Sequence, residues 1–173
     1  MEEKINNILQ GGGSECGAEL KEISLSDPYG IAELINDKNG NNDPKFVSPI
    51  LLAYIGDSVY DLIIRTALVL KGNRQVAKLN KDAVLLVSAK AQSKIADIIL
   101  PMLNEEETGV YRRGVNSKPN TKSKNASFRE YMKATGFEAL VGYLYLSGKT
   151  GRITELVKTG IDGIKEPNTD GKE

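Results

Sequence analysis

Apolar residues recur every three or four positions through most of the chain after residue 48, which is the period of a helix with a buried face. Ser48 followed by Pro49 is a typical helix start, and Gly148 is a predicted stop. No segment alternates with a period of two, so the sequence predicts an all-α bundle. The helices are predicted over 49–71, over 76–99 as one stretch, and over 105–113, 128–147 and 150–164.

Composition divides the chain into three parts. Residues 1–45 carry nine acids against four lysines and include glycine- and asparagine-rich runs, so we expect a weakly ordered acidic extension with a short helix near 28–36. Residues 46–164 are the expected folded domain, and residues 165–173 a polar tail. We find no leader-like or membrane-spanning apolar segment and expect a cytoplasmic protein without a membrane partner.

The chain contains no histidine and a single cysteine, Cys16. This composition excludes Ser-His-Asp and Cys-His catalysis, histidine general bases, internal disulfides and cysteine-rich zinc sites. Any catalysis must therefore use carboxylates, lysine, tyrosine, hydroxyl groups or a hard metal ion held by oxygen ligands.

Two acidic residues, Asp57 and Glu138, interrupt otherwise apolar helices. An unpaired carboxylate in such a place is costly, so each must be paired, neutralised or bound to a cation. In a structural interpretation, each acid pairs with an arginine such as Arg65 or faces water.

In a functional interpretation, both acids face one cleft and share a divalent metal ion. Gly56 and Gly142 favour this hypothesis, because positions without a side chain let two helices approach closely. Asp61, one turn after Asp57, would add a third acid, unless it is an ordinary exposed residue of the helix.

Positive charge is concentrated in residues 112–133, which carry seven bases and one acid. The stretch 111–125 has few apolar residues and is predicted to be a surface loop. Its arginine, lysine, asparagine and hydroxyl groups are those that contact nucleic-acid phosphates, although a solvated loop has the same composition. The scarcity of nearby aromatic residues favours contact with a duplex backbone over stacking on single-stranded bases. The candidate RNA-binding residues are Arg112, Arg113, Asn116, Lys118, Lys122, Lys124 and Arg129.

Over about 48–160 the chain resembles the Mini-ribonuclease III family, the branch of ribonuclease III that lacks a separate double-stranded-RNA-binding domain. The motifs that carry the resemblance, in the family's order, are Leu52–Tyr60, Val87–Gln92, Arg112–Lys118 and Phe137–Leu146. The resemblance implies a ribonuclease III endonuclease-domain helical bundle that acts as a homodimer. It also implies cleavage of double-stranded RNA with Mg²⁺, or with Mn²⁺ as its substitute, usually in the stem of the 23S ribosomal RNA precursor.

The resemblance further implies that Asp57 and Glu138 are the catalytic carboxylates and metal ligands, since they match the family's Gly-Asp and Phe-Glu-Ala motifs. Ala53 and Thr135 stand where full-length ribonuclease III has two more acids, so one Mg²⁺ per site is easier to support than two. The acidic extension is expected to cover the RNA cleft or to contact a ribosomal protein.

Two other functions stay open on the sequence alone. A non-catalytic RNA- or ribosome-binding dimer with the same fold would bind RNA without cutting it. A helical interaction module with purely structural acids would have no affinity for RNA at low salt. We rank the metal-dependent nuclease first.

Overall fold

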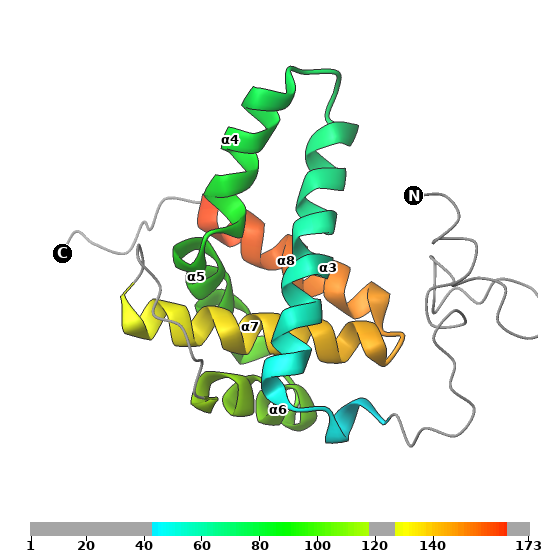
Figure 1. Cartoon of the computed structure of the whole chain (residues 1–173), viewed down its shortest axis with the longest axis vertical. Helices are drawn as coiled ribbons and strands as arrows, with labels where there is room; N and C mark the ends of the chain where they lie inside the picture. Colours follow the sequence, from blue (N-terminus) through cyan, green and yellow to red (C-terminus); the bar gives the residue numbers. More distant parts are fainter. Residues whose placement is uncertain (1–42, 118–126, 166–173) are drawn as a thin grey trace, which may run out of the picture.

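The computed structural model describes residues 43–117 and 127–165, which form a helical bundle without strands in these two ranges (Figure 1). This confirms the predicted all-α class. The elements are η1 (Pro44–Phe46), α3 (Pro49–Leu70), α4 (Val76–Val87), α5 (Ala89–Ile99), η2 (Leu100–Met102), α6 (Glu105–Asn116), α7 (Phe128–Leu146) and α8 (Thr150–Lys165). The predictions for the extension before residue 43, including the helix near 28–36, and for the tail beyond residue 165 lie outside the described residues.

Helix α7 lies at the centre of the bundle. Every residue from Ala134 to Leu144 is buried except Glu138. Helix α3 crosses α7, α5 and α6 pack along it, and α8 contacts α5 and α7 (Figure 1). In the core, the rings of Tyr60 and Phe137 meet edge to face, with centroids 5.0 Å apart. The α3–α7 crossing therefore joins the two helices that carry the candidate acids.

The start of α3 and the end of α7 agree with the sequence prediction. The Ser48 side chain accepts a hydrogen bond from the Leu51 backbone N–H, which caps α3. Gly148 follows α7 with a φ of 68°, a left-handed conformation that glycine adopts without strain.

The single helix predicted over 76–99 is wrong, because the chain breaks at Ser88 into α4 and α5. Ser88 has an extended backbone with ψ 147°, and its side chain accepts from the Ala91 N–H to start α5. A serine that caps a new helix changes the chain direction although the apolar pattern continues. The break turns the buried face of α5 toward α7 and α8.

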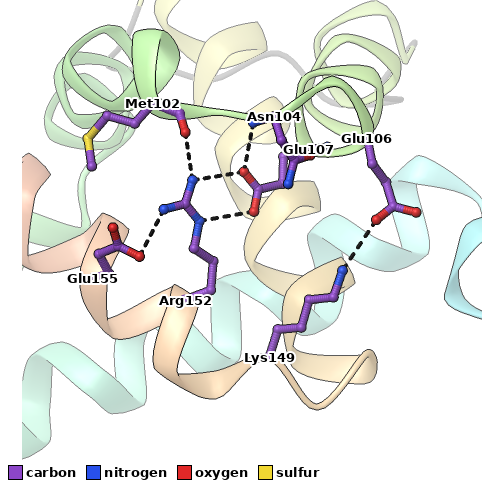
Figure 2. A network of polar contacts seen from close by, with 7 residues as sticks. All are labelled: Met102, Asn104, Glu106, Glu107, Lys149, Arg152 and Glu155. Carbon is purple, nitrogen blue, oxygen red and sulfur yellow. Dashed lines mark hydrogen bonds and ion pairs between the residues drawn. The ribbon is translucent and has the colours of Figure 1, made fainter.

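A buried ion pair holds α8 against the start of α6 (Figure 2). Glu107 is 2% exposed, and its carboxylate accepts two hydrogen bonds of 3.0 Å from Arg152. Asn104 completes a capping box with Glu107, and Arg152 also donates to the Met102 carbonyl oxygen. Burial raises the pKa of Glu107, but the bonds from Arg152 and the Asn104 backbone outweigh it and lower the pKa overall. The carboxylate thus stays charged and fixes one end of the bundle.

No helix within the described ranges is long and apolar enough to cross a membrane.

Candidate active site

The backbones of α3 and α7 touch where the two helices cross. A Cβ atom on Gly56 would lie 1.8 Å from the Glu138 carbonyl oxygen, and one on Gly142 would lie 2.0 Å from the Leu52 carbonyl oxygen. Only glycine permits this approach, so the close contact expected at these two positions is confirmed. It also fixes the acids, since Asp57 follows Gly56 and Glu138 lies one turn before Gly142.

Asp57 and Glu138 lie close enough together for the charge of one to affect the other. Burial, and then the charge of Asp57, raises the pKa of Glu138 to about 8. Burial, and then the charge of Asp61, raises the pKa of Asp57. Burial acts more strongly on Glu138, which is partly buried, than on Asp57, which keeps an exposed surface. Adjacent carboxylates that resist ionisation are typical of functional sites that bind a cation or move a proton.

Neither acid forms an ion pair with another side chain in the described ranges. Arg65 instead pairs with Asp61 at 2.5 Å and donates to the Asn80 side chain at 3.0 Å. The predicted pairing of Asp57 with Arg65 is therefore wrong, whereas the exposure of Asp57 agrees with the other structural alternative, an acid that faces water.

Two carboxylates, rather than three, come together at the crossing. Asp61 is held by Arg65, and the described residues contain no group of three or more acidic, histidine or cysteine side chains able to hold a metal ion. The assignment of Asp57 and Glu138 as metal ligands stays a prediction. Their oxygen-only chemistry fits a hard cation such as Mg²⁺, which keeps several waters and needs few protein ligands.

The side-chain amide of Gln92, on α5, faces both acids. It lowers the pKa of each carboxyl group, against the effect of burial. Gln92 is only 1% exposed, yet its Nε2 atom forms no hydrogen bond with any group in the described ranges. A buried amide nitrogen without a partner is rare in native proteins. The position of this unpaired amide beside two carboxylates indicates a site that binds a ligand.

Gln92 was not predicted as a site residue, although the sequence holds the signal. It shares the buried face of α5 with Ile95, Ala96 and Ile99, at spacings of three, four and seven residues. A polar residue on an apolar helix face is the same feature that identified Asp57 and Glu138.

A cavity of about 440 Å³ brings together three of the predicted RNA-binding residues, Arg112, Asn116 and Arg129. Asp97 and Lys133 also line it, and they form an ion pair of 2.5 and 2.7 Å between α5 and α7. We call this cavity, between α5, α6 and the start of α7, the basic groove. Its exposed arginines leave their charge available to an anionic ligand.

Two lysines that the sequence analysis did not select lie near the basic groove. The pKa of Glu130 is lowered first by hydrogen bonds from Ser127 and also by the charges of Lys90 and Lys94, which places these lysines near the start of α7. They are exposed on α5, one turn apart, while Gln92 between them is buried. Their four-residue spacing is the signal that would have found them.

The helix predicted over 105–113 continues to Asn116 as α6, so the surface loop expected over 111–125 is wrong for the residues up to 116. Burial of Val110, Tyr111 and Gly114 extends the helix beyond the predicted end. Arg112, Arg113 and Asn116 are therefore helical, and Arg113 does not line the basic groove. Three other predicted RNA-binding residues lie outside the described ranges, namely Lys118, Lys122 and Lys124.

Comparison with known proteins identifies the class. Residues 51–149 match the ribonuclease III domain family. The chain is 46% identical to Mini-ribonuclease 3 of Clostridium tetani over 125 residues, which cover 72% of this chain and 83% of that protein. It is 45% identical to Mini-ribonuclease 3 of a Thermoanaerobacter species, covering 69% and 84% of the two chains. A crystal structure of a Fusobacterium nucleatum protein superposes with a TM-score of 0.63 at 33% identity, covering 69% of this chain and 95% of that one.

The chain thus carries a ribonuclease III domain, and within that class it belongs to the Mini-ribonuclease 3 family. It is an endoribonuclease of the ribonuclease III type. The family and the enzyme class implied by the sequence motifs are both confirmed.

Proposed function

We propose that this endoribonuclease cuts double-stranded RNA with Mg²⁺ at Asp57 and Glu138, and that its substrate is the stem of the 23S ribosomal RNA precursor in the cytoplasm. The observation that supports the proposal most strongly is the meeting of two carboxylates without cationic partners where α3 crosses α7. The basic groove beside the same central helix supplies a phosphate-binding surface.

Asp57 and Glu138 would hold the cation through their carboxylate oxygens, with Mn²⁺ able to replace Mg²⁺. When bound, the metal would polarise the phosphodiester and activate water for hydrolysis. The raised pKa of Glu138 means that this carboxyl group gives up its proton readily only when a positive charge is nearby. The positive charge of a bound cation would therefore favour the ionised form of both carboxyl groups.

The basic groove would hold the RNA backbone. Arg129 and Glu138 are nine residues apart on α7, or about 13 Å along the helix axis at 1.5 Å per residue. Nine residues are about two and a half turns, so the two side chains leave α7 on opposite sides. The groove residues Arg112, Asn116 and Arg129 would therefore hold a part of the RNA backbone away from the phosphate at the carboxylates. Contact with phosphates rather than bases suits a substrate recognised by duplex shape.

We also propose that the enzyme acts as a homodimer. Leu51, Tyr54, Leu62 and Val69 are exposed on α3 at helical spacing, which leaves an apolar row on the helix that carries Asp57. Two sites related by a two-fold axis would cut the two antiparallel strands of a duplex equivalently. Sedimentation of the purified chain measures its oligomeric state. A ribosomal-protein partner is a further prediction, assigned to the extension that lies outside the described residues.

The first test is a cleavage assay on a labelled duplex RNA stem that joins the ends of the 23S ribosomal RNA precursor. We expect cutting with Mg²⁺, no cutting with EDTA, and no cutting of either strand supplied alone. The variant Asp57→Asn should bind the duplex and leave it intact, because an amide cannot supply the carboxylate charge.

Binding without cutting in Mg²⁺ and Mn²⁺ would instead support the non-catalytic RNA-binding dimer. Cutting of single strands would contradict the duplex substrate while leaving the nuclease class in place. Absence of RNA binding at low salt would contradict both.

The basic groove gives a second prediction. Arg112→Ala and Arg129→Ala should each weaken duplex binding and lower the slope of log affinity against log salt by about one, because each removes roughly one phosphate contact. Lys158→Ala, an exposed lysine on α8 that does not line the groove, is the matched control and should leave the slope unchanged. Equal slopes for all three variants would exclude the groove as the binding surface.

A further inference from the structure

Gln92 is the buried polar residue that the proposed reaction does not explain. It comes from α5, a third helix beside the α3–α7 crossing, and it reaches both candidate carboxylates. Its Nε2 atom carries two N–H donors, and burial hides them from water while neither acid accepts from them with good geometry. An ordinary core position would have this amide paired or replaced by an apolar residue.

A carboxamide is a suitable neighbour for two carboxylates, because it can donate to both. Its two N–H groups can serve one oxygen of each acid, which leaves the other oxygens free to face a cation. Side chains that hydrogen-bond to metal ligands fix the orientation of those ligands and tune their affinity. The structure thus places beside Asp57 and Glu138 a group of the kind that supports metal ligands by hydrogen-bonding to them.

We propose that Gln92 is a positioning residue that orients Asp57 and Glu138 toward a shared divalent cation, an inference that rests on the proposed metal-dependent function. The amide nitrogen of Gln92 is buried and has no hydrogen-bond partner in the described ranges. With a cation held between the two carboxylates, the Gln92 N–H groups would donate to the carboxylate oxygens. Gln92 contacts neither the RNA nor the reacting phosphate in this arrangement and acts only through the carboxylates.

The test measures Mn²⁺ binding to the full chain without RNA, by calorimetry and by electron paramagnetic resonance. Gln92→Met keeps the length of the side chain and removes both donors. We expect its Mn²⁺ dissociation constant to rise at least about ten-fold, the usual effect of removing such a support. The thermal stability of the metal-free variant should be equal or higher, because an unpaired buried amide has been replaced by an apolar group.

Two more variants sharpen the test. Gln92→Asn keeps the amide but withdraws it by one methylene, so its affinity for Mn²⁺ should fall between those of the other two proteins, and this variant serves if Gln92→Met does not fold. Ser93→Ala changes the next residue of α5, which is also buried, and should bind Mn²⁺ as the unmodified chain does.

The outcomes separate this inference from the proposed function. If the unmodified chain binds Mn²⁺ and Gln92→Met binds it equally well, Gln92 is a core residue and the inference fails alone. If the unmodified chain binds no divalent cation, the metal site and the inference fail together. A loss of affinity in Ser93→Ala as large as in Gln92→Met would also overturn the inference, because disturbance of α5 would then explain both.

Discussion

Replacing Glu138 by glutamine should stabilise the metal-free protein at alkaline pH and, in the same molecule, lower RNA cleavage about a thousand-fold or more. The loss of cleavage follows from the proposed metal site. A metal ion held by this carboxylate would contribute several kcal/mol to the transition state, and each 1.4 kcal/mol corresponds to about ten-fold in rate. The gain in stability follows because Glu138 is costly to ionise where it stands, among the buried residues of α7. A residue kept for function at the expense of stability behaves in this way.

The sign of the pH effect follows from the two pKa values of Glu138. In the folded protein burial, and then Asp57, raises the pKa to about 8, whereas the ordinary value is 4.5. Between these values the folded state holds a proton that the unfolded state has lost, so the free energy of unfolding falls as the pH rises. The cost is complete above about pH 8. Glutamine cannot ionise, so the variant avoids a cost of roughly 2–4 kcal/mol, at about 1.4 kcal/mol per pKa unit and less where solvent reaches the group.

Thermal unfolding of both proteins in EDTA, from pH 5 to pH 9, measures this effect. The curves should diverge with rising pH, with Glu138→Gln the more stable. Saturating Mg²⁺ should narrow the difference, because only the unmodified chain gains stability from binding. Glu105→Gln, at an exposed position on α6, is the control and should change stability by no more than about 0.5 kcal/mol at any pH while it retains cleavage. Parallel curves for Glu138→Gln and the unmodified chain would contradict the buried, proton-holding carboxyl group.

The features that sequence reasoning predicted are those that one helix reveals by itself. Asp57 and Glu138 stood out because a carboxylate on an apolar helix is costly wherever that helix packs. Gly56 and Gly142 stood out for the converse reason, since a missing side chain on a buried helix implies a close neighbour. The helical class and the start of α3 at Ser48 likewise depend on local pattern and capping.

The features that sequence reasoning missed depend on which helices are neighbours in the folded domain. Gln92 gains its meaning only when α5 is known to lie against the crossing of α3 and α7. The break at Ser88 changes the direction of the chain and so places α5 against the crossing. The apolar pattern continues through Ser88, so periodicity alone does not reveal the break. Composition placed Arg112 and Arg129 in one candidate set, but the cavity that they share depends on the packing of α6 on α7.

Gly142→Ala should be among the most destabilising single changes in the domain. The added Cβ would lie 2.0 Å from the Leu52 carbonyl oxygen and 2.9 Å from the Leu52 carbonyl carbon and from Ile55 Cγ2. Two of these contacts are backbone, so no rotamer change relieves them and α3 must move away from α7. Overpacking of a core usually costs about 1–3 kcal/mol, and contact with a backbone atom places this change at or above the upper end. We expect the melting temperature to fall by about 10 °C or more.

The same substitution at Gly151 provides a matched control with the opposite sign. Gly151 lies in the first turn of α8, with a negative φ and no atom within 4 Å of an added Cβ. Alanine there should leave stability unchanged or raise it by up to about 1 kcal/mol, because alanine favours the helix over glycine. Thermal unfolding of Gly142→Ala, Gly151→Ala and the unmodified chain compares the three stabilities. Equal stability of Gly142→Ala and the unmodified chain would show that the two backbones do not touch.

Any Gly142→Ala protein that still folds should also bind divalent cations more weakly, because the crossing that brings the helices together is the one that brings the acids together. Gly56 contacts the backbone of Glu138 itself, so α3 cannot shift at Gly142 without moving Asp57 relative to Glu138. A misplacement of about 1 Å in a catalytic group can cost a hundred-fold in rate. Mn²⁺ binding to the folded fraction should therefore weaken in Gly142→Ala and stay unchanged in Gly151→Ala. The two glycines thus act as determinants of the site as much as of the fold.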